Sequence, residues 1–312
     1  MRIVFAGSPA IAVPSLEAIV SNTEGFELIR VLTNPDTPKG RHGTPQPTEV
    51  GEAAEKLGVP IFKPIKLDSS AREEIAVLKP DILVSFAYGH IFGPKFLELF
   101  PLGGINIHPS LLPKYRGPTP IQAAILNGDK ITGVSIQKLA LEIDSGDILA
   151  AEQIYLTGTE TTGTLSEIAA VKAAEMLPKV LGKIAKGEQG VPQDHSQASF
   201  CRLIGREDGV IDWGCTAIEI EARIRAYSPR PLCRTIHNGR TLFILKGAVY
   251  TGEQSVGGKS GQVLGINNQY GIMIQTGDGI LTVTELQYSG KKALFWKDFL
   301  NGARDFIESI LG

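Results

Sequence analysis

The fold is decided by the segment Ile105-Asn106-Ile107-His108-Pro109-Ser110-Leu111-Leu112-Pro113. Apolar and polar residues alternate over its first four positions, which predicts a strand. A period of two puts the side chains of Asn106 and His108 on the same face of that strand. The chain then enters a proline-bounded turn that cannot continue the pairing. We therefore expect an amide and a titratable imidazole side by side at a strand end, where open α/β sheets bind their ligands.

Outward from this segment, strands and helices alternate along the first part of the chain. The predicted strands are mainly apolar segments at 2–5, 26–33, 81–86 and 105–108, and the predicted helices lie at 14–20, 49–57 and 164–184. Two later strands are expected at 133–137 and 148–154, paired antiparallel with each other. This alternation predicts an α/β domain whose parallel sheet is covered by helices on both faces.

The character of the sequence changes near residue 187. The stretch 187–193 is polar and contains Gly and Pro, which predicts a linker. Farther on we expect one helix and then short strands between glycine turns, a pattern typical of a small OB-like β-barrel. The helix is predicted at 217–226 and the strands at 241–246, 261–264, 271–275 and 280–286. We predict a first domain over residues 1–186, a linker over 187–205 and a second domain over 206–312.

Composition excludes several classes of protein. The chain has 312 residues, 43% apolar and 21% charged, which is typical of a globular protein of two domains. Its net charge of −2 means that any nucleic-acid surface must be a local basic patch. Cys201, Cys215 and Cys233 match no zinc motif, so we expect reduced thiols, no metal and a cytoplasmic protein. No apolar run reaches the ~18–20 residues that span a bilayer, so no membrane association is expected.

An acid is expected to join Asn106 and His108. The stretch 141–148 offers Asp144 and Asp147 in a Gly-containing loop, and spacing alone does not choose between them. The chain has no nucleophilic Ser or Cys in a strand–helix elbow, which argues against a covalent intermediate. The combination suits direct acyl transfer, because an amide and an imidazole can bind a developing oxyanion. The carboxylate can hold the imidazole charged and relay protons.

The chain resembles the folate-dependent formyltransferases. The resemblance lies in the segment 105–113 and in Tyr115-Arg116-Gly117, Pro120-Ile121-Gln122, Gly133-Val134 and Asp144-Ser145-Gly146-Asp147-Ile148. It implies a Rossmann-like parallel-sheet formyltransferase domain followed by the OB-like domain, with 10-formyltetrahydrofolate as the formyl donor. The catalytic trio of the family falls on Asn106, His108 and Asp144. The folate-binding residues fall on Ser110, Leu111, Leu112 and Pro113, and on the turn Phe86, Tyr88 and Gly89, which contributes mainly backbone groups.

Further motifs resemble the members of that family that act on tRNA. These motifs are the opening Phe5-Ala6-Gly7-Ser8-Pro9, the loop 33–41, and the stretches 209–213, 224–231 and 287–292. They imply that the acceptor is the α-amino group of initiator methionyl-tRNA, and that the product is N-formylmethionyl-tRNA for translation initiation. The implied tRNA contacts are Arg41, Lys39, Lys291 and Lys292. We expect a monomer.

Other functions remain open at this point. The same trio serves relatives that formylate an amino-sugar nucleotide or glycinamide ribonucleotide, and it can act on water in a 10-formyltetrahydrofolate hydrolase. The loop 35–43 and the basic second domain favour tRNA among these. A nucleotide-binding module without catalysis is disfavoured, because the turn Ala6-Gly7-Ser8-Pro9 lacks a GxGxxG pattern and the chain has no Walker lysine.

Overall fold

A computed structural model describes residues 1–22, 25–39, 43–252 and 257–312, with Lys39 described by its backbone only. The chain divides into two compact units. The N-terminal unit contains residues 1–120, 131–155 and 166–201, and the C-terminal unit contains residues 121–130, 156–165 and 202–312. Each unit is built on its own β-sheet.

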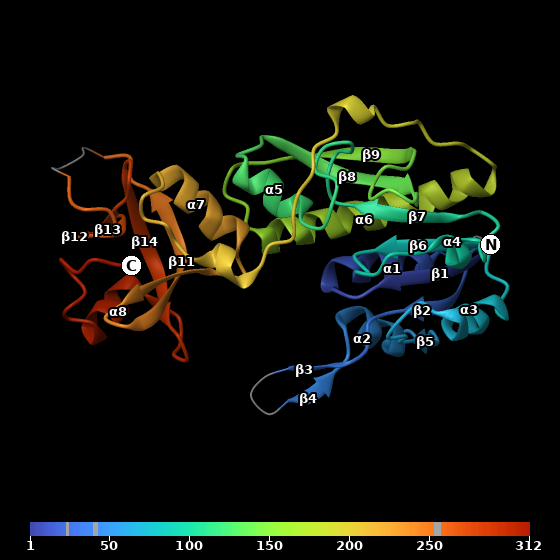
Figure 1. Ribbon diagram of the computed structural model, residues 1–312, viewed down its shortest axis with the longest axis horizontal. Helices are drawn as coiled ribbons and strands as arrows, with labels where there is room; N and C mark the ends of the chain where they lie inside the picture. The colour runs from blue at the N-terminus through green and yellow to red at the C-terminus, as the bar shows by residue number, and fades with distance from the viewer. Residues whose placement is uncertain (23–24, 40–42, 253–256) are drawn as a thin grey trace. The chain divides into compact units, whose positions relative to one another are not determined.

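The N-terminal unit is built on a seven-stranded sheet in the order β5-β2-β1-β6-β7-β8-β9 (Figure 1). The strands from β5 to β7 are parallel, whereas β8 runs antiparallel to both β7 and β9. This arrangement confirms the predicted parallel sheet and its late antiparallel pair. The strands are β1 Arg2–Gly7, β2 Glu27–Leu32, β5 Ile61–Phe62, β6 Ile82–Phe86, β7 Gly104–His108, β8 Ile131–Lys138 and β9 Ile148–Tyr155.

The helices of the first part of the chain include three that were predicted and three that were not. The predicted ones are α1 Val13–Ser21, α2 Glu49–Lys56 and α6 Thr162–Ala185. The others, α3 Ser69–Ala76, α4 Pro94–Leu97 and α5 Pro120–Leu126, are short, and α3 buries only Ala71 and Ile75. A short helix with a narrow apolar stripe gives a weak periodic signal. The stronger sign of α3 is its N-cap, because Asp68 accepts a hydrogen bond from the Ala71 amide at 3.2 Å.

Short elements complete this part of the chain. Single turns of 3₁₀ helix lie at Ala10–Ala12, His195–Gln197 and Arg206–Gly209. The predicted loop after β2 contains the hairpin strands β3 Thr37–Lys39 and β4 Thr44–Gln46.

The carboxyl ends of β1, β6 and β7 lie at one edge of the sheet. The chain leaves β1 toward β2 on one side, and later returns to β6 on the other side of β1. Such a reversal of strand order is where open α/β sheets bind ligands. Ser85 of β6 is paired with Asn106 of β7, so the turn after β6 lies beside the end of β7.

An aromatic cluster supports the turn after β6. Tyr88, Phe92, Phe96 and Phe100 follow one another with ring centroids 5.5–5.7 Å apart. All are buried, and they pack with Val4, Ala6, Leu32, Ile75 and Leu83 of the core. Aromatic side chains bury large apolar areas, so this series fixes the backbone of the turn.

The C-terminal unit is built on an antiparallel sheet in the order β10-β11-β14-β13-β12, with β15 paired to β14. The strands are β10 Cys233–His237, β11 Arg240–Val249, β12 Val263–Asn267, β13 Gly271–Gln275, β14 Ile280–Tyr288 and β15 Leu294–Phe295, and the helices are α7 Ala217–Ala226 and α8 Trp296–Gly302. The predicted helix and strands are present. The strand β10 was not predicted, because its inward residues include Thr235 and His237 and it lacks an apolar run.

In the ranges that the structure describes, no helix is both long enough and apolar enough to cross a membrane. The same ranges contain no group of three or more His, Cys, Asp or Glu side chains arranged to hold a metal ion. Cys201, Cys215 and Cys233 are free thiols.

Candidate active site

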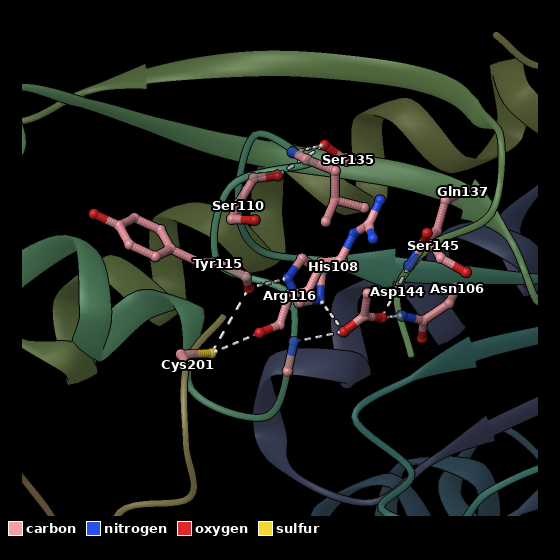
Figure 2. A network of polar contacts seen from close by, with 12 residues as sticks. Asn106, His108, Ser110, Tyr115, Arg116, Ser135, Gln137, Asp144, Ser145 and Cys201 are labelled. Atoms are coloured by element: carbon pink, nitrogen blue, oxygen red, sulfur yellow. Dashed lines mark hydrogen bonds and ion pairs between the residues drawn. The ribbon is translucent and has the colours of Figure 1, made fainter. Parts of the chain in front are cut away.

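Asn106, His108 and Asp144 come together on one face of the sheet (Figure 2). The first two side chains project from β7, and the third comes from the loop between β8 and β9. Nδ1 of His108 lies 3.5 Å from Oδ2 of Asp144, and the Asn106 amide donates to Oδ1 of Asp144 at 3.3 Å. The other candidate acid, Asp147, lies 3.8 Å from Nζ of Lys138, and its side chain is 39% exposed. The structure therefore brings Asp144 to the pair, and not Asp147.

Two more donors hold the Asp144 carboxylate. The Gln137 carboxamide donates to Oδ1 at 2.9 Å, and the backbone N–H of Gly117 donates to Oδ2 at 2.8 Å. The Asp144 side chain is only 11% exposed, so these bonds replace water around its charge.

Sequence reasoning missed the role of Gln137. Gln137 is paired with Asn106 across the sheet, and Ser135 of the same strand is paired with His108. Cross-strand partners share a face of a sheet. Two buried polar residues with a spacing of two, Ser135 and Gln137, are a signal for this shared face.

Both ring nitrogens of His108 face acceptors. Nε2 lies 2.8 Å from the carbonyl oxygen of Tyr115, and a carbonyl can only accept, so Nε2 carries the proton of the neutral ring. Nδ1 then directs its lone pair toward Asp144. Burial lowers the pKa of His108 below its ordinary value, while the charge of Asp144 and the bond to Tyr115 act in the opposite direction. The resting imidazole is thus arranged to take up a proton at Nδ1.

The predicted folate-binding turn is tightly held against β8. Within the turn, the Ser110 hydroxyl donates to the Lys114 carbonyl at 2.5 Å. From β8, the Ser135 hydroxyl donates to the Ser110 carbonyl at 2.7 Å and accepts from the Leu112 backbone amide at 3.1 Å. The peptide bond between Leu112 and Pro113 is cis. A side chain at Gly133 would meet Leu111, with a Cβ only 2.5 Å from Cδ2 of that leucine. The Ser135 hydroxyl therefore attaches the turn to β8 beside His108.

The turn after β6 offers its backbone at the same edge. The side chains of Phe86 and Tyr88 are buried in the core, while Ala87 and Gly89 are exposed and have positive φ angles of 52° and 85°. The Tyr88 carbonyl accepts from the side-chain amide of Asn34 at 3.2 Å. The Tyr88 hydroxyl is buried without a hydrogen-bond partner in the described ranges, and burial raises the pKa of Tyr88 to about 12.

The predicted tRNA-binding residues have different outcomes. Arg41 and the side chain of Lys39 lie outside the described residues. Lys291 and Lys292 are exposed in the turn between β14 and β15, where the Lys291 carbonyl accepts from Gln287 at 2.7 Å. By contrast, Arg225 is held by Glu221 at 2.6 Å and Arg234 by Glu207 at 3.1 Å, which commits these two guanidinium groups to contacts within the protein.

Comparison with protein families agrees with this geometry. Residues 1–181 match the family model described as formyl transferase, and residues 203–304 match the one described as formyl transferase, C-terminal domain. The chain belongs to the formyl transferase family.

Curated relatives narrow this assignment. The chain is 47% identical over 320 residues to the methionyl-tRNA formyltransferase of Treponema denticola, covering 99% of this chain and 98% of the relative. It is 42% identical to that of Treponema pallidum, strain Nichols, and 38% identical to that of Borrelia duttonii, covering 99% of each relative. Within the family, the chain belongs with the methionyl-tRNA formyltransferases.

Solved structures share the fold at low sequence identity. The N-formyltransferase from Helicobacter canadensis, crystallised with folinic acid and dTDP-3-aminofucose, matches with a TM-score of 0.66 and 21% identity, covering 91% of this chain and 99% of its own. HypX from Aquifex aeolicus, crystallised with tetrahydrofolic acid, matches with a TM-score of 0.65 and 17% identity. That match covers 99% of this chain and 48% of HypX, so this chain spans about half of HypX.

Replacing Asp144 should change the titration of His108 in a defined direction. Asp144→Asn removes the negative charge that raises the pKa of the imidazole, so this pKa, already below about 6.5 in the unmodified protein, should fall further. The measurement is a pH titration by NMR of the protein labelled with ¹⁵N-histidine, with His108→Gln to assign the signal. Asp147→Asn, which neutralises the neighbouring carboxylate, should leave the pKa of His108 unchanged. An unchanged or raised pKa in Asp144→Asn would show that the carboxylate does not act on this ring.

Proposed function

We propose that the protein transfers the formyl group of 10-formyltetrahydrofolate to the α-amino group of initiator methionyl-tRNA, giving N-formylmethionyl-tRNA for translation initiation. The observation that carries the proposal is the grouping of Asn106, His108 and Asp144 at a ligand-binding edge, in a chain that matches methionyl-tRNA formyltransferases over its full length. Formyltetrahydrofolate acts as a donor substrate, and no metal is required.

Asn106 is assigned to the oxyanion. Attack of the amine on the formyl carbon produces a tetrahedral intermediate with a negatively charged oxygen. Within the described part of the chain, the Asn106 carboxamide donates one hydrogen bond, to Asp144, and the residue is partly exposed. Its second N–H is therefore available to donate to that oxygen. The bond to Asp144 holds the amide plane in place before the substrate arrives.

His108 is assigned to proton transfer. The attacking amine must be uncharged, and its unperturbed pKa of about 7.7–8.0 makes this a modest requirement. As the new C–N bond forms, the amine gives up one proton, which Asp144 relays to Nδ1 of His108, and the carboxylate then stabilises the resulting imidazolium. When the bond between the formyl carbon and the folate nitrogen breaks, that nitrogen takes up the proton. The ring ends in its starting state.

The folate is assigned to the turns at the end of β6 and β7. Gly89 and Ala87 expose backbone groups there, and Ser110, Leu112 and Pro113 form the rigid turn that follows His108. Support for these assignments comes from the adjacency of β6 and β7 in the sheet, which places both turns beside the imidazole.

The tRNA is assigned to local basic residues, because the chain carries a net charge of −2. Lys291 and Lys292 are exposed, and neither forms an ion pair with another of the described residues. Arg41 and Lys39 are assigned to the tRNA from the sequence resemblance.

The choice of acceptor tests the proposal directly. Purified protein with 10-formyltetrahydrofolate should formylate methionyl-tRNA, and should act far more slowly on an amino-sugar nucleotide, on glycinamide ribonucleotide and on water. The measurement is transfer of a ¹⁴C-formyl group to each acceptor, with release of formate to report hydrolysis. Efficient transfer to the sugar nucleotide, or formate release without transfer, would replace the proposed function by that activity.

Removing the oxyanion donor should affect turnover more than binding. Asn106→Ala should lower kcat by about 10²–10³-fold while KM for both substrates changes by less than about threefold. His108→Ala should have an effect of the same kind, because proton transfer is then lost. Asn127→Ala, at an exposed asparagine, is the control and should keep normal kinetics. Near-normal kcat in both active-site variants would remove these residues from the mechanism.

Removing the exposed lysines should weaken tRNA binding specifically. Lys291→Ala combined with Lys292→Ala should raise KM for methionyl-tRNA and leave kcat at saturating tRNA unchanged. The slope of log affinity against log salt should become shallower by about 1 for each phosphate that a lysine no longer neutralises. Lys56→Ala combined with Lys66→Ala removes the same charge from exposed positions of the N-terminal unit and serves as the control. An unchanged salt slope would exclude Lys291 and Lys292 from the tRNA interface.

A further inference from the structure

We propose that Gln193 is a positioning residue for the reaction, because its buried carboxamide fixes the loop that presents Asp144 to Asn106 and His108. This inference rests on the proposed role of Asp144. It assigns a function to a residue of the predicted linker, a segment that carries no catalytic motif in the sequence.

Gln193 reaches the Asp144 loop with its amide nitrogen. Nε2 lies 2.9 Å from the carbonyl oxygen of Asp144 and 2.7 Å from that of Gly146. It also lies 3.1 Å from Oε1 of Gln137. Gln193 is only 6% exposed, so water does not compete for these bonds. Its two N–H groups thus face three acceptors, two carbonyls of one loop and one side chain of β8, so that one N–H is shared between two of them.

The oxygen of the same carboxamide is held by Arg116. Oε1 of Gln193 accepts from Nε of Arg116 at 3.1 Å and from Nη2 at 2.6 Å. A guanidinium can only donate, so this contact determines which end of the Gln193 amide is oxygen. Arg116 is 3% exposed, and within the described ranges it forms no ion pair with a carboxylate. Gln193 therefore joins a buried positive charge to the Asp144 loop.

Gln137 connects Gln193 to the carboxylate itself. Its Oε1 accepts from Gln193, and its Nε2 donates to Oδ1 of Asp144 at 2.9 Å. The two carboxamides therefore form a continuous chain of hydrogen bonds from the Arg116 guanidinium to the Asp144 carboxylate. Hydrogen bonds in such a chain polarise one another, which strengthens the donor that faces the carboxylate.

The loop needs an external support of this kind. It must turn back over the sheet, because β8 ends at Lys138 beside Ile105, whereas Asp144 contacts Asn106 and His108. Asp144 has a positive φ of 50°, which a residue with a side chain rarely adopts. Leu139 packs against the aromatic cluster where the loop begins, but Leu141 and Ile143, which are closer to Asp144, are 76% and 60% exposed. Polar contacts from Gln193 therefore hold the part of the loop around Asp144, where hydrophobic packing does not.

Two substitutions separate positioning from folding. Gln193→Leu removes both ends of the carboxamide. Gln193→Glu keeps an acceptor for Arg116 but replaces the N–H donors by oxygen, so it isolates the bonds to the loop. Gln197→Ala is the matched control, because Gln197 lies in the same segment, is exposed and bonds through its side chain to Asp194.

We expect both Gln193 variants to lower kcat about 10- to 100-fold, the loss that a displacement of about 1 Å can cause, with KM for both substrates within about threefold. The pKa of His108, followed by ¹⁵N NMR, should fall in Gln193→Leu because the carboxylate moves away. In the Asp144→Asn background the same substitution should leave that pKa unchanged. Thermal unfolding is measured for each variant and for the control. The kinetic comparison is then made at temperatures where all of them are folded.

Each other outcome has a defined meaning. A purely structural role predicts a lower unfolding temperature with kcat and the His108 titration unchanged below it, and that result would overturn the inference. A normal kcat in Gln193→Glu would equally exclude the loop-facing donors. If Asp144→Asn itself has normal turnover, the proposed role of Asp144 fails first. If Asp144→Asn is inactive while both Gln193 variants are normal, only the present inference fails.

Discussion

One largely buried carboxylate governs the arrangement of the catalytic unit. Asp144 accepts hydrogen bonds from Asn106, from Gln137 and from the backbone of Gly117, and it faces the ring of His108. A carboxylate with so little water around it is tolerated only when donors surround it. Those donors come from β7, from β8 and from the chain that follows the predicted folate-binding turn. The requirement to satisfy one charge thus accounts for the polar side chains of Asn106 in β7 and Gln137 in β8.

The parts of the site that could be predicted from the sequence are those set by local geometry. Asn106 and His108 share a face because a strand repeats every two residues, and the turn after them ends the strand because of its prolines. Sequence spacing does not separate Asp144 from Asp147. What separates them is the path of a loop in which Asp144 takes a left-handed conformation and Asp147 lies beside Lys138. That path depends on contacts from distant segments, which no local pattern records.

The missed parts of the fold have similar explanations. The buried positions of β10 include Thr235 and His237, whereas apolar residues there would have indicated a strand. Both have partners elsewhere in the C-terminal unit. Trp213 donates to Thr235, and the Tyr288 hydroxyl lies 2.6 Å from Nδ1 of His237. Arg116 is part of a recognisable motif, but its burial against Gln193 joins positions far apart in the sequence. Periodicity identifies which side chains face a core, and it does not identify which polar side chains meet there.

The segment after α6 has a consequence for where the catalytic unit ends. Family similarity over the first domain stops at residue 181, and α6 stops at Ala185, but the compact unit continues to Cys201. In that stretch Ser199 accepts from the Tyr115 amide at 2.9 Å, next to the carbonyl that binds His108. A fragment cut after α6 would keep every strand of the sheet and all three residues of the trio, yet it would lack Gln193 and Ser199. The catalytic unit therefore needs a stretch without long helices or strands to be complete. Proteolysis in that stretch would leave the sheet intact and remove contacts that hold the site.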